Sequence, residues 1–225
     1  MIATLLFASV GFAKTIQTNH ISMSSAPNWV TKRSVVKIED RIQNELEWSI
    51  RKIRVYWYSN QREFEKLHGK GPLVRAFTKR SDLSIHLGPA VSQTLFSGIL
   101  GHELVHVVIL QKYHSSIPNW LDEGMANTIA KNSKVDYRWL ASQPLPPVKS
   151  MSDPFLGGNP RLMYQMSTAV MEMISKKCDI HDLLQLSLKS KLEIYLSQTC
   201  ELTDLDSELK VWIHKKTGKL SPQKK

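Results

Sequence analysis

The spacing of apolar residues indicates that the first half of the chain combines helices with strands. Over residues 35–50, apolar side chains recur at every third or fourth position, as they do on one face of a helix. Residues 53–59 are rich in β-branched and aromatic side chains, which predicts a strand. A short helix over residues 60–68, ended by glycines, precedes two further predicted strands at 73–79 and 82–88.

From residue 94 onward the pattern predicts helices almost throughout. The predicted helices cover residues 94–112, 120–132, 137–141, 161–176, 181–189 and 202–214. The Pro- and Gly-rich segment 142–160 is predicted to be a surface loop. Because the strands are confined to the first half, the sequence predicts an α+β fold, with a small N-terminal mixed sheet and helices followed by an all-helical C-terminal half.

The chain has 225 residues, which fits a single domain, predicted here at residues 28–215. Residues 1–13 resemble a signal peptide, because a short apolar run ends at Ala13 in a small-x-small cleavage pattern. No Lys or Arg precedes that run, so a buried N-terminal segment is the alternative interpretation. The run is too short to cross a bilayer as a helix, and no transmembrane span is expected in the mature chain. The sequence therefore predicts an exported protein, either periplasmic or secreted.

The charge of the chain favours anionic partners. Its formal net charge is +10, and much of the excess lies near the C-terminus, where residues 216–225 are predicted to form a disordered basic tail. No stripe of Lys and Arg interleaved with aromatic residues marks a nucleic-acid groove, so nucleic acid is not an expected partner. Contact with an anionic surface of the cell envelope is the expectation that the charge supports.

The two cysteines, Cys178 and Cys200, leave two interpretations open. In an exported protein an even number of cysteines favours a disulfide, which would stabilise the fold by about 3 kcal/mol in the chain-entropy model. Two ordinary buried thiols are the alternative. Neither cysteine lies in a Cys-x-x-Cys motif, so redox catalysis has no support in the sequence.

The strongest chemical signal is the segment GHELVH in the predicted helix 94–112. His102 and His106 are four residues apart and leave the same helix face, a spacing at which two imidazoles can reach one zinc ion. Glu103 is rotated by about 100° from His102 and would lie beside the ion, where a carboxylate can take a proton from an attacking water. Apolar residues surround this trio, and polar groups on such a helix are costly unless they are satisfied. The pattern predicts one Zn²⁺ per chain.

A catalytic zinc ion needs a third protein ligand. His114 lies two turns beyond His106, about 12 Å along the helix axis, so it cannot converge with the histidine pair. The three-histidine pattern of the metzincins requires Gly and His at positions that Ile109 and Lys112 occupy here. The remaining candidate is Glu123, within the segment NWLDEGMA on the next predicted helix.

Together, HELVH and WLDEGMA resemble the gluzincin group of zinc metallopeptidases, which includes the thermolysin-like and aminopeptidase N-like families. In those families a second helix supplies a glutamate ligand from a Trp-Leu-x-Glu-Gly segment. Residues 120–124 match this segment, with Asp122 at the variable position. The resemblance covers roughly residues 80–170 in organisation. It implies a zincin-like fold of the small peptidase type.

The resemblance also implies roles for the residues of the motif. His102, His106 and Glu123 would bind zinc, and Glu103 would be the general base that hydrolyses bonds in a peptide or protein substrate. A zinc-binding, peptidase-like domain that acts as a non-catalytic binding or assembly factor in the envelope is the alternative. A helical envelope protein without a metal is the third interpretation. Nothing in the sequence identifies the substrate or distinguishes an endopeptidase from an exopeptidase.

Residues outside the ligand set are less certain, and each has two interpretations. Asn127 would orient a zinc-bound histidine, although the family typically has a carboxylate there, or would be an ordinary helix-surface residue. Tyr164 would donate to the oxyanion of the reaction, or would pack on the core. His181 is a weaker oxyanion candidate, with a surface or capping role as the stronger interpretation. The strand at 82–88 would be the edge strand that pairs with an extended peptide, and His86 on it is expected to be structural.

Overall fold

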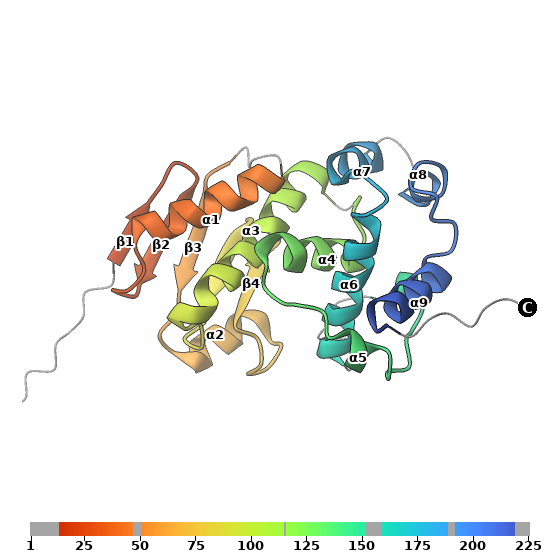
Figure 1. Ribbon diagram of the computed structural model, residues 1–225. Helices are drawn as coiled ribbons and strands as arrows, with labels where there is room; N and C mark the ends of the chain where they lie inside the picture. The colour runs from red at the N-terminus through yellow and green to blue at the C-terminus, as the bar shows by residue number, and fades with distance from the viewer. Residues whose placement is uncertain (1–13, 47–50, 115, 152–158, 189–191, 219–225) are drawn as a thin grey trace, which may run out of the picture.

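The computed structural model describes residues 14–46, 51–114, 116–151, 159–188 and 192–218. The predicted signal peptide, most of the predicted basic tail and part of the predicted loop at 142–160 lie outside the described residues. Within the described part, a mixed sheet lies at one end of the molecule and the C-terminal helices lie at the other (Figure 1). One contiguous cluster of buried apolar side chains extends from the sheet to the last helix.

The sheet has five strands in the order β1-β2-β3-β5-β4. The strands are β1 (Lys14–Gln17), β2 (Ile21–Ala26), β3 (Ile53–Trp57), β4 (Ala76–Lys79) and β5 (Ser84–Leu87). β2 and β5 both pair in parallel with β3, whereas β1 and β4 pair antiparallel with β2 and β5. α1 (Lys32–Glu45) connects β2 to β3, and α2 (Gln61–His68) follows β3. The sheet is therefore mixed, as the sequence predicts.

The order of the strands corrects one prediction. The segment 82–88 is not an edge strand, because β4 folds back antiparallel on β5 and leaves β5 between β3 and β4. β4 is therefore the strand at this edge of the described sheet. β1 and β2 are strands that the apolar spacing does not predict, and they precede residue 28, the predicted start of the domain.

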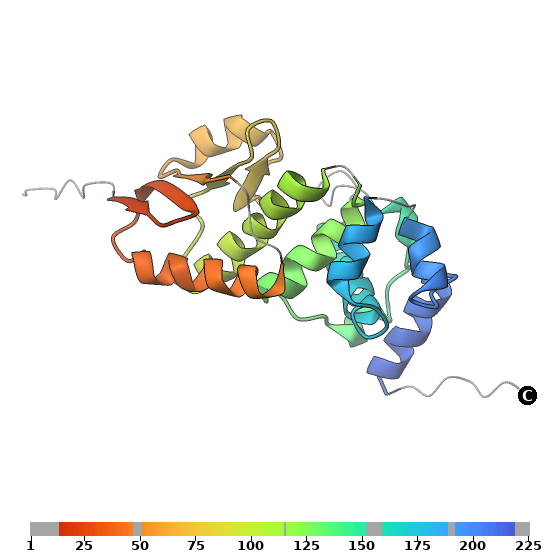
Figure 2. The same cartoon turned by 90° about the horizontal axis from the view of Figure 1, so that it is seen from above.

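α1 and α3 (Gln93–Tyr113) cover one face of the sheet, and α2 lies on the other side (Figure 2). α1 begins at Thr31, whose hydroxyl accepts from the backbone N–H of Ser34 while the Ser34 hydroxyl accepts in return from the backbone N–H of Thr31. This reciprocal cap satisfies two donors that a helix end otherwise leaves unpaired. By length and hydropathy alone, α3 is the one described helix that would suffice to cross a membrane, but its side chains are largely buried in the protein core.

After β5 the described chain is helical. The elements are α3, α4 (Asn119–Ala130), α5 (Tyr137–Leu140), the 3₁₀ helix η1 (Val148–Ser150), α6 (Pro160–Ile174), α7 (Ile180–Ser187), α8 (Leu192–Gln198) and α9 (Leu205–Lys216). The sequence does not predict α8, which is short. A disulfide joins Cys178, just after α6, to Cys200, just after α8, with Cα atoms 5.3 Å apart. Strands in the first half and helices in the second make the chain an α+β protein.

α4 lies between α3 and α6 and is the element that completes the site described below. Gly124 allows this close packing, because a Cβ atom there would collide with the backbone carbonyl of Ser167 and with Met171 on α6. The glycine of the WLDEGMA segment thus has a packing reason of its own. Gly124 thus lets α4 pack closely against α6, and in this position the neighbouring Glu123 faces α3.

Candidate metal centre

The structure brings together the three residues that the sequence predicts as metal ligands. His102 and His106 lie one turn apart on α3, and Glu123 lies on the facing turn of α4. One ligand atom from each residue falls within 4.8 Å of the others. The Nε2 atoms of the two imidazoles are 3.1 Å apart. The Glu123 carboxylate is 3.4 Å from Nε2 of His102 and 3.8 Å from Nε2 of His106. We call these three residues the metal-ligand group.

These separations fit a bound metal ion. Two nitrogen or oxygen ligands at 2.0–2.1 Å from a tetrahedral ion lie about 3.3 Å apart, and the three observed separations lie on either side of this value. One carboxylate oxygen, Oε2 of Glu123, is buried and has no hydrogen-bond partner. A buried acceptor without a donor costs about 1–3 kcal/mol, and a cation would remove that cost. The group can therefore hold a metal ion.

Asp122 orients one of the two histidines, a role that the sequence analysis did not assign to it. Nδ1 of His106 lies 2.8 Å from Oδ1 of Asp122. A carboxylate only accepts hydrogen bonds, so Nδ1 carries the proton and Nε2 directs its lone pair at the metal position. Arg80, on the turn after β4, lies 3.9 Å from the other oxygen of Asp122. The sequence offers one signal for this role, since Asp122 directly precedes the ligand Glu123 in a buried helix.

The charges around the group favour a cation. Burial alone would lower the pKa of His106, but the carboxylates of Asp122 and Glu123 raise it to about 10. Burial alone would raise the pKa of Glu123, but His106 and His102 hold it below its ordinary value. Two imidazoles and two carboxylates therefore attract a positive charge into the space between them, whether a proton or a metal ion.

Glu103 lies beside the metal-ligand group on α3, and a residue of the sheet bonds to its carboxylate. The hydroxyl of Thr78, on β4, donates to Oε2 of Glu103 over 2.8 Å. This bond fixes the carboxylate of Glu103 and links the edge strand to the helix that carries the histidines. Thr78 is a second residue that the sequence analysis missed, because its place opposite Glu103 depends on the strand order and not on a local pattern.

Two of the less certain residues lie near the group. Tyr164, on α6, lines the same cavity as the metal-ligand group, with its ring centroid 6.2 Å from that of His102. Asn127 is buried on α4, so it is not a helix-surface residue. Its amide NH2 donates to the hydroxyl of Thr168 on α6, over 3.1 Å. Its amide oxygen does not accept from either histidine, because Nδ1 of His106 bonds to Asp122 and Nδ1 of His102 has no hydrogen-bond partner. The predicted orienting contact of Asn127 is therefore wrong, and Asp122 makes that contact instead.

The other histidines that the sequence analysis weighed lie elsewhere. His114 is the C-cap of α3 and lines a different cavity. His181 is exposed in the first turn of α7, where its backbone N–H donates to Asp179. His86 is buried on β5, and both its ring nitrogens have hydrogen-bond partners. The surface role of His181 and the structural role of His86 agree with the stronger interpretation of each.

Three neighbouring cavities follow one another along β4 and α3. The metal cavity, of about 120 Å³, holds the metal-ligand group and Glu103. A cavity of about 380 Å³ continues toward the start of α3, where Leu95 lines it, and shares Glu103 and Tyr164 with the metal cavity. A third cavity, of about 650 Å³, continues toward the end of α3 and shares Arg80 and Leu110 with the metal cavity. The shared lining residues place the metal cavity between the two larger cavities, and we call this row of three cavities the cleft.

No protein-family model matches the sequence, and a search of curated proteins finds no match to it either. The resemblance to the gluzincins therefore depends on the residues of the two motifs and on the geometry of the site that they form.

Proposed function

We propose that the protein is a zinc-dependent metallopeptidase of the gluzincin type, with a zincin-like fold. The observation that carries this proposal is the convergence of His102, His106 and Glu123 from two adjacent helices, with Glu103 beside them. Two imidazoles and one glutamate are a known ligand set of catalytic zinc. Calcium and magnesium prefer ligand sets made of oxygen atoms, so zinc suits this group better.

Each residue around the metal position would have a different role in peptide hydrolysis. Zinc, when bound, supplies a Lewis acid for the scissile carbonyl and lowers the pKa of a water to about 7. Glu103 takes the proton from the attacking water and passes it to the leaving amine, and the bond from Thr78 holds its carboxylate in place. Asp122 keeps His106 in the tautomer that binds the metal. Tyr164 faces the same cavity and donates from its hydroxyl to the developing oxyanion.

The shape of the site supports an enzyme over a non-catalytic binding factor. The metal cavity has a larger cavity on each side with which it shares lining residues, and an extended substrate chain would follow this row past the metal position. β4 forms the edge of the described sheet, and its residues Ala76 to Thr78 line the metal cavity. An unpaired strand edge offers N–H and C=O groups to an extended peptide, which would lie along β4.

An exported location remains part of the proposal. The disulfide between Cys178 and Cys200 supports it, because disulfides persist in oxidising compartments. The net charge of +10 supports contact with an anionic surface of the envelope.

The proposal is tested by comparing the parent protein with Glu103→Gln on a peptide library, with zinc quantified in both. We expect about one zinc per chain in each protein and a loss of about 10²–10⁴-fold in kcat/KM for the variant. Glu193→Gln is the matched control, because Glu193 is exposed on α8, far along the chain from the metal-ligand group, and forms an exposed ion pair with Lys149 at 3.8 Å. Equal cleavage by Glu103→Gln and the parent would show that the mechanism is wrong. Zinc binding without cleavage of any peptide would favour the non-catalytic factor.

A further inference from the structure

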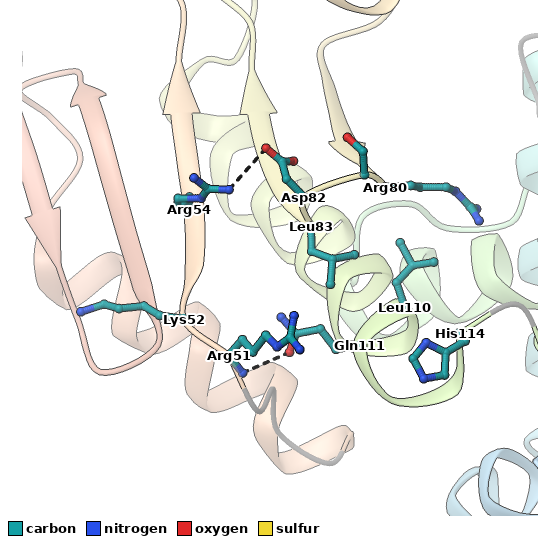
Figure 3. A pocket seen from close by; sticks show the side chains of 10 residues that line it. Arg51, Lys52, Arg54, Arg80, Asp82, Leu83, Leu110, Gln111 and His114 are labelled. Atoms are coloured by element: carbon teal, nitrogen blue, oxygen red, sulfur yellow. Dashed lines mark hydrogen bonds and ion pairs between the residues drawn. The ribbon is translucent and has the colours of Figure 1, made fainter.

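A cavity lies at the end of the cleft beyond His106, and we call it the basic pocket. Its volume is about 650 Å³. Its walls come from three places: the start of β3, the turn between β4 and β5, and the last turns of α3 (Figure 3). None of the metal-ligand group lines it, so the basic pocket is a separate compartment of the same cleft.

The side chains of the basic pocket combine an apolar floor with a cationic rim. Leu83 and Leu110 lie next to each other between the sheet and α3 (Figure 3). Arg51 and Arg54 lie on the β3 side of the pocket. Leu83 has a φ of +54°, a left-handed conformation that disfavours a leucine, so the turn holds this side chain at the pocket despite a local cost.

The one carboxylate among the lining residues is already engaged. Asp82 lies 3.4 Å from the guanidinium of Arg54 and accepts a hydrogen bond from Ser84 over 2.7 Å. Burial would raise the pKa of this carboxyl, but the bond from Ser84 is the largest effect and keeps the pKa below its ordinary value. A guanidinium has five N–H donors and one carboxylate accepts at most two of them in parallel. Asp82 thus positions Arg54 and leaves it able to bind a second anion.

Arg80 connects the basic pocket to the metal cavity. Arg80 and Leu110 line both spaces. In Figure 3 the guanidinium of Arg80 points away from Asp82, in agreement with its ion pair to Asp122 at the metal site. A chain that crosses the metal position can therefore place a side chain one or a few residues away into the basic pocket.

We propose that the basic pocket binds the carboxylate of an acidic side chain of the substrate, so that the protein cleaves acidic peptides. This inference rests on the proposed function of the metal site. A glutamate fits both parts of the pocket: its methylene groups pack on Leu83 and Leu110, and its carboxylate meets the guanidinium of Arg54, while Arg51 adds to the positive charge of the pocket. The net charge of +10 also raises the local concentration of acidic peptides.

The experiment uses two peptide libraries that are identical except for one fixed position, which holds Glu in one library and Gln in the other. The fixed position is moved stepwise along the peptide. For the zinc-loaded parent we expect kcat/KM to be about tenfold higher with Glu at a single position on one side of the cleaved bond, as one charge-assisted contact provides. Kd is measured separately on Glu103→Gln, which is expected to cleave the peptides too slowly to disturb the binding measurement.

Arg54→Gln is the test variant and Lys52→Gln is its matched control. Both changes remove one positive charge from the lining of the same pocket, but Lys52 points away from the other lining side chains (Figure 3). We expect Arg54→Gln to remove most of the preference for Glu, and Lys52→Gln to keep it. Zinc content and the midpoint of thermal unfolding verify that both variants are folded, and Arg51→Gln provides a second test that does not disturb Asp82.

Three outcomes would overturn the proposed role of the basic pocket. A fourth would overturn only the proposed metallopeptidase function. If the parent cleaves Glu and Gln peptides at equal rates, the basic pocket does not select acidic residues, but the proposed function stands. If Lys52→Gln reduces the preference as much as Arg54→Gln does, the effect belongs to the overall charge and the proposal is wrong. If an anionic polysaccharide binds in an Arg54-dependent way and Glu peptides do not, the pocket serves another ligand. If Glu peptides bind more tightly but none is cleaved, the proposed function fails and the pocket's role in binding acidic peptides stands.

Discussion

Two buried histidine sites in the described part of the protein differ in how the hydrogen bonds of their imidazoles are completed. His86 lies on β5 with 6% of its surface exposed, and His102 lies on α3 with 7% exposed. Both sites also contain aromatic neighbours and nearby carboxylates. Burial of a polar side chain is costly in either place, so each site has to satisfy its imidazole in some way. The two solutions show what separates a structural histidine from a metal ligand.

At His86 the hydrogen bonds are complete within the protein. The Ser84 hydroxyl has one proton, which it donates to Asp82, so it accepts from Nε2 of His86. Nδ1 of His86 is then the acceptor for the hydroxyl of Tyr58, 2.9 Å away. Phe77 stacks on the imidazole with ring centroids 4.7 Å apart. Both ring nitrogens are used and the ring is fixed, so no lone pair is directed at an empty position.

At the metal-ligand group the hydrogen bonds are not complete. His106 has its orienting partner, Asp122, but the two Nε2 atoms face each other at 3.1 Å with the Glu123 carboxylate beside them. Nδ1 of His102 and Oε2 of Glu123 are buried without a hydrogen-bond partner. The cost of the unpaired Oε2 of Glu123, which faces Nε2 of His102, is one that a bound cation removes. Convergent and incompletely paired atoms, not burial, therefore mark the candidate metal centre.

The largest effect that distinguishes the two sites is expected in metal content. His102→Ala removes one of the three ligands and should weaken zinc binding more than about a hundredfold, because a zinc site gains roughly 3 kcal/mol from each ligand. His86→Phe should leave about one zinc per chain. Its cost should be about 1–3 kcal/mol in the free energy of unfolding, since Tyr58 and Ser84 each lose a partner. Elemental analysis and urea unfolding measure the two quantities.

The opposite pattern would abolish the distinction between the sites. If His86→Phe lost zinc, or if His102→Ala retained a full equivalent of zinc at nanomolar affinity, the assignment of the metal ligands would be wrong. Unfolding of the two variants is compared in the presence of a chelator, so that the stabilisation by bound zinc does not contribute to the difference.

A smaller effect on zinc affinity is expected when substitutions of Asp122 and Asn127 are compared. Asp122→Asn removes the charged partner of His106 and should weaken zinc binding by about tenfold, as the loss of an orienting carboxylate typically does. Asn127→Ala should leave zinc affinity unchanged and lower the free energy of unfolding by about 1 kcal/mol, because its amide bonds only to Thr168. Competition with a fluorescent zinc chelator measures both affinities. A tenfold loss in Asn127→Ala with none in Asp122→Asn would restore the orienting role that the motif predicts for Asn127.

The three residues of the metal-ligand group could be predicted from the sequence because their geometry is mostly local. A spacing of four residues places His102 and His106 on one helix face whatever the rest of the fold does. Glu123 lies on the next helix after a short connection, so few arrangements of α3 and α4 are available to it. The helices with strong apolar spacing were predictable for the same reason.

The residues that support the ligands depend on contacts between distant segments, and the sequence could not reveal them. Thr78 meets Glu103 only because β4 is the edge strand, and strand order is set by long-range pairing. β2 has the sequence ISMSSA, in which only Ile21 and Met23 are large and apolar. The small polar residues around them make the alternation too short to predict a strand. Its place in the sheet comes from parallel pairing with β3, which no local pattern encodes. Asp122 was assigned to the variable position of a motif, so its contact with His106 was not anticipated.

The smallest effect is in the pH dependence of stability, and it belongs to His86. Burial is the main cause that lowers the pKa of His86 below its ordinary value of 6.5; Asp82 opposes this effect, whereas Lys79 and Arg54 add to it. Between the lowered pKa of folded His86 and the ordinary pKa of 6.5 in the unfolded chain, the unfolded chain takes up a proton that folded His86 does not. The contribution of His86 to the free energy of unfolding is therefore fully present above pH 6.5 and is lost as the pH falls through the folded pKa. His86→Phe lacks this contribution, and its free energy of unfolding should fall less steeply than that of the parent between about pH 7 and pH 5. Urea unfolding of both proteins in chelator at closely spaced pH values measures the difference, in which the other titrating groups cancel. Parallel curves would mean that His86 is protonated as readily in the folded protein as in the unfolded chain, and the hydrogen bonds of Tyr58 and Ser84 would then not hold the imidazole neutral.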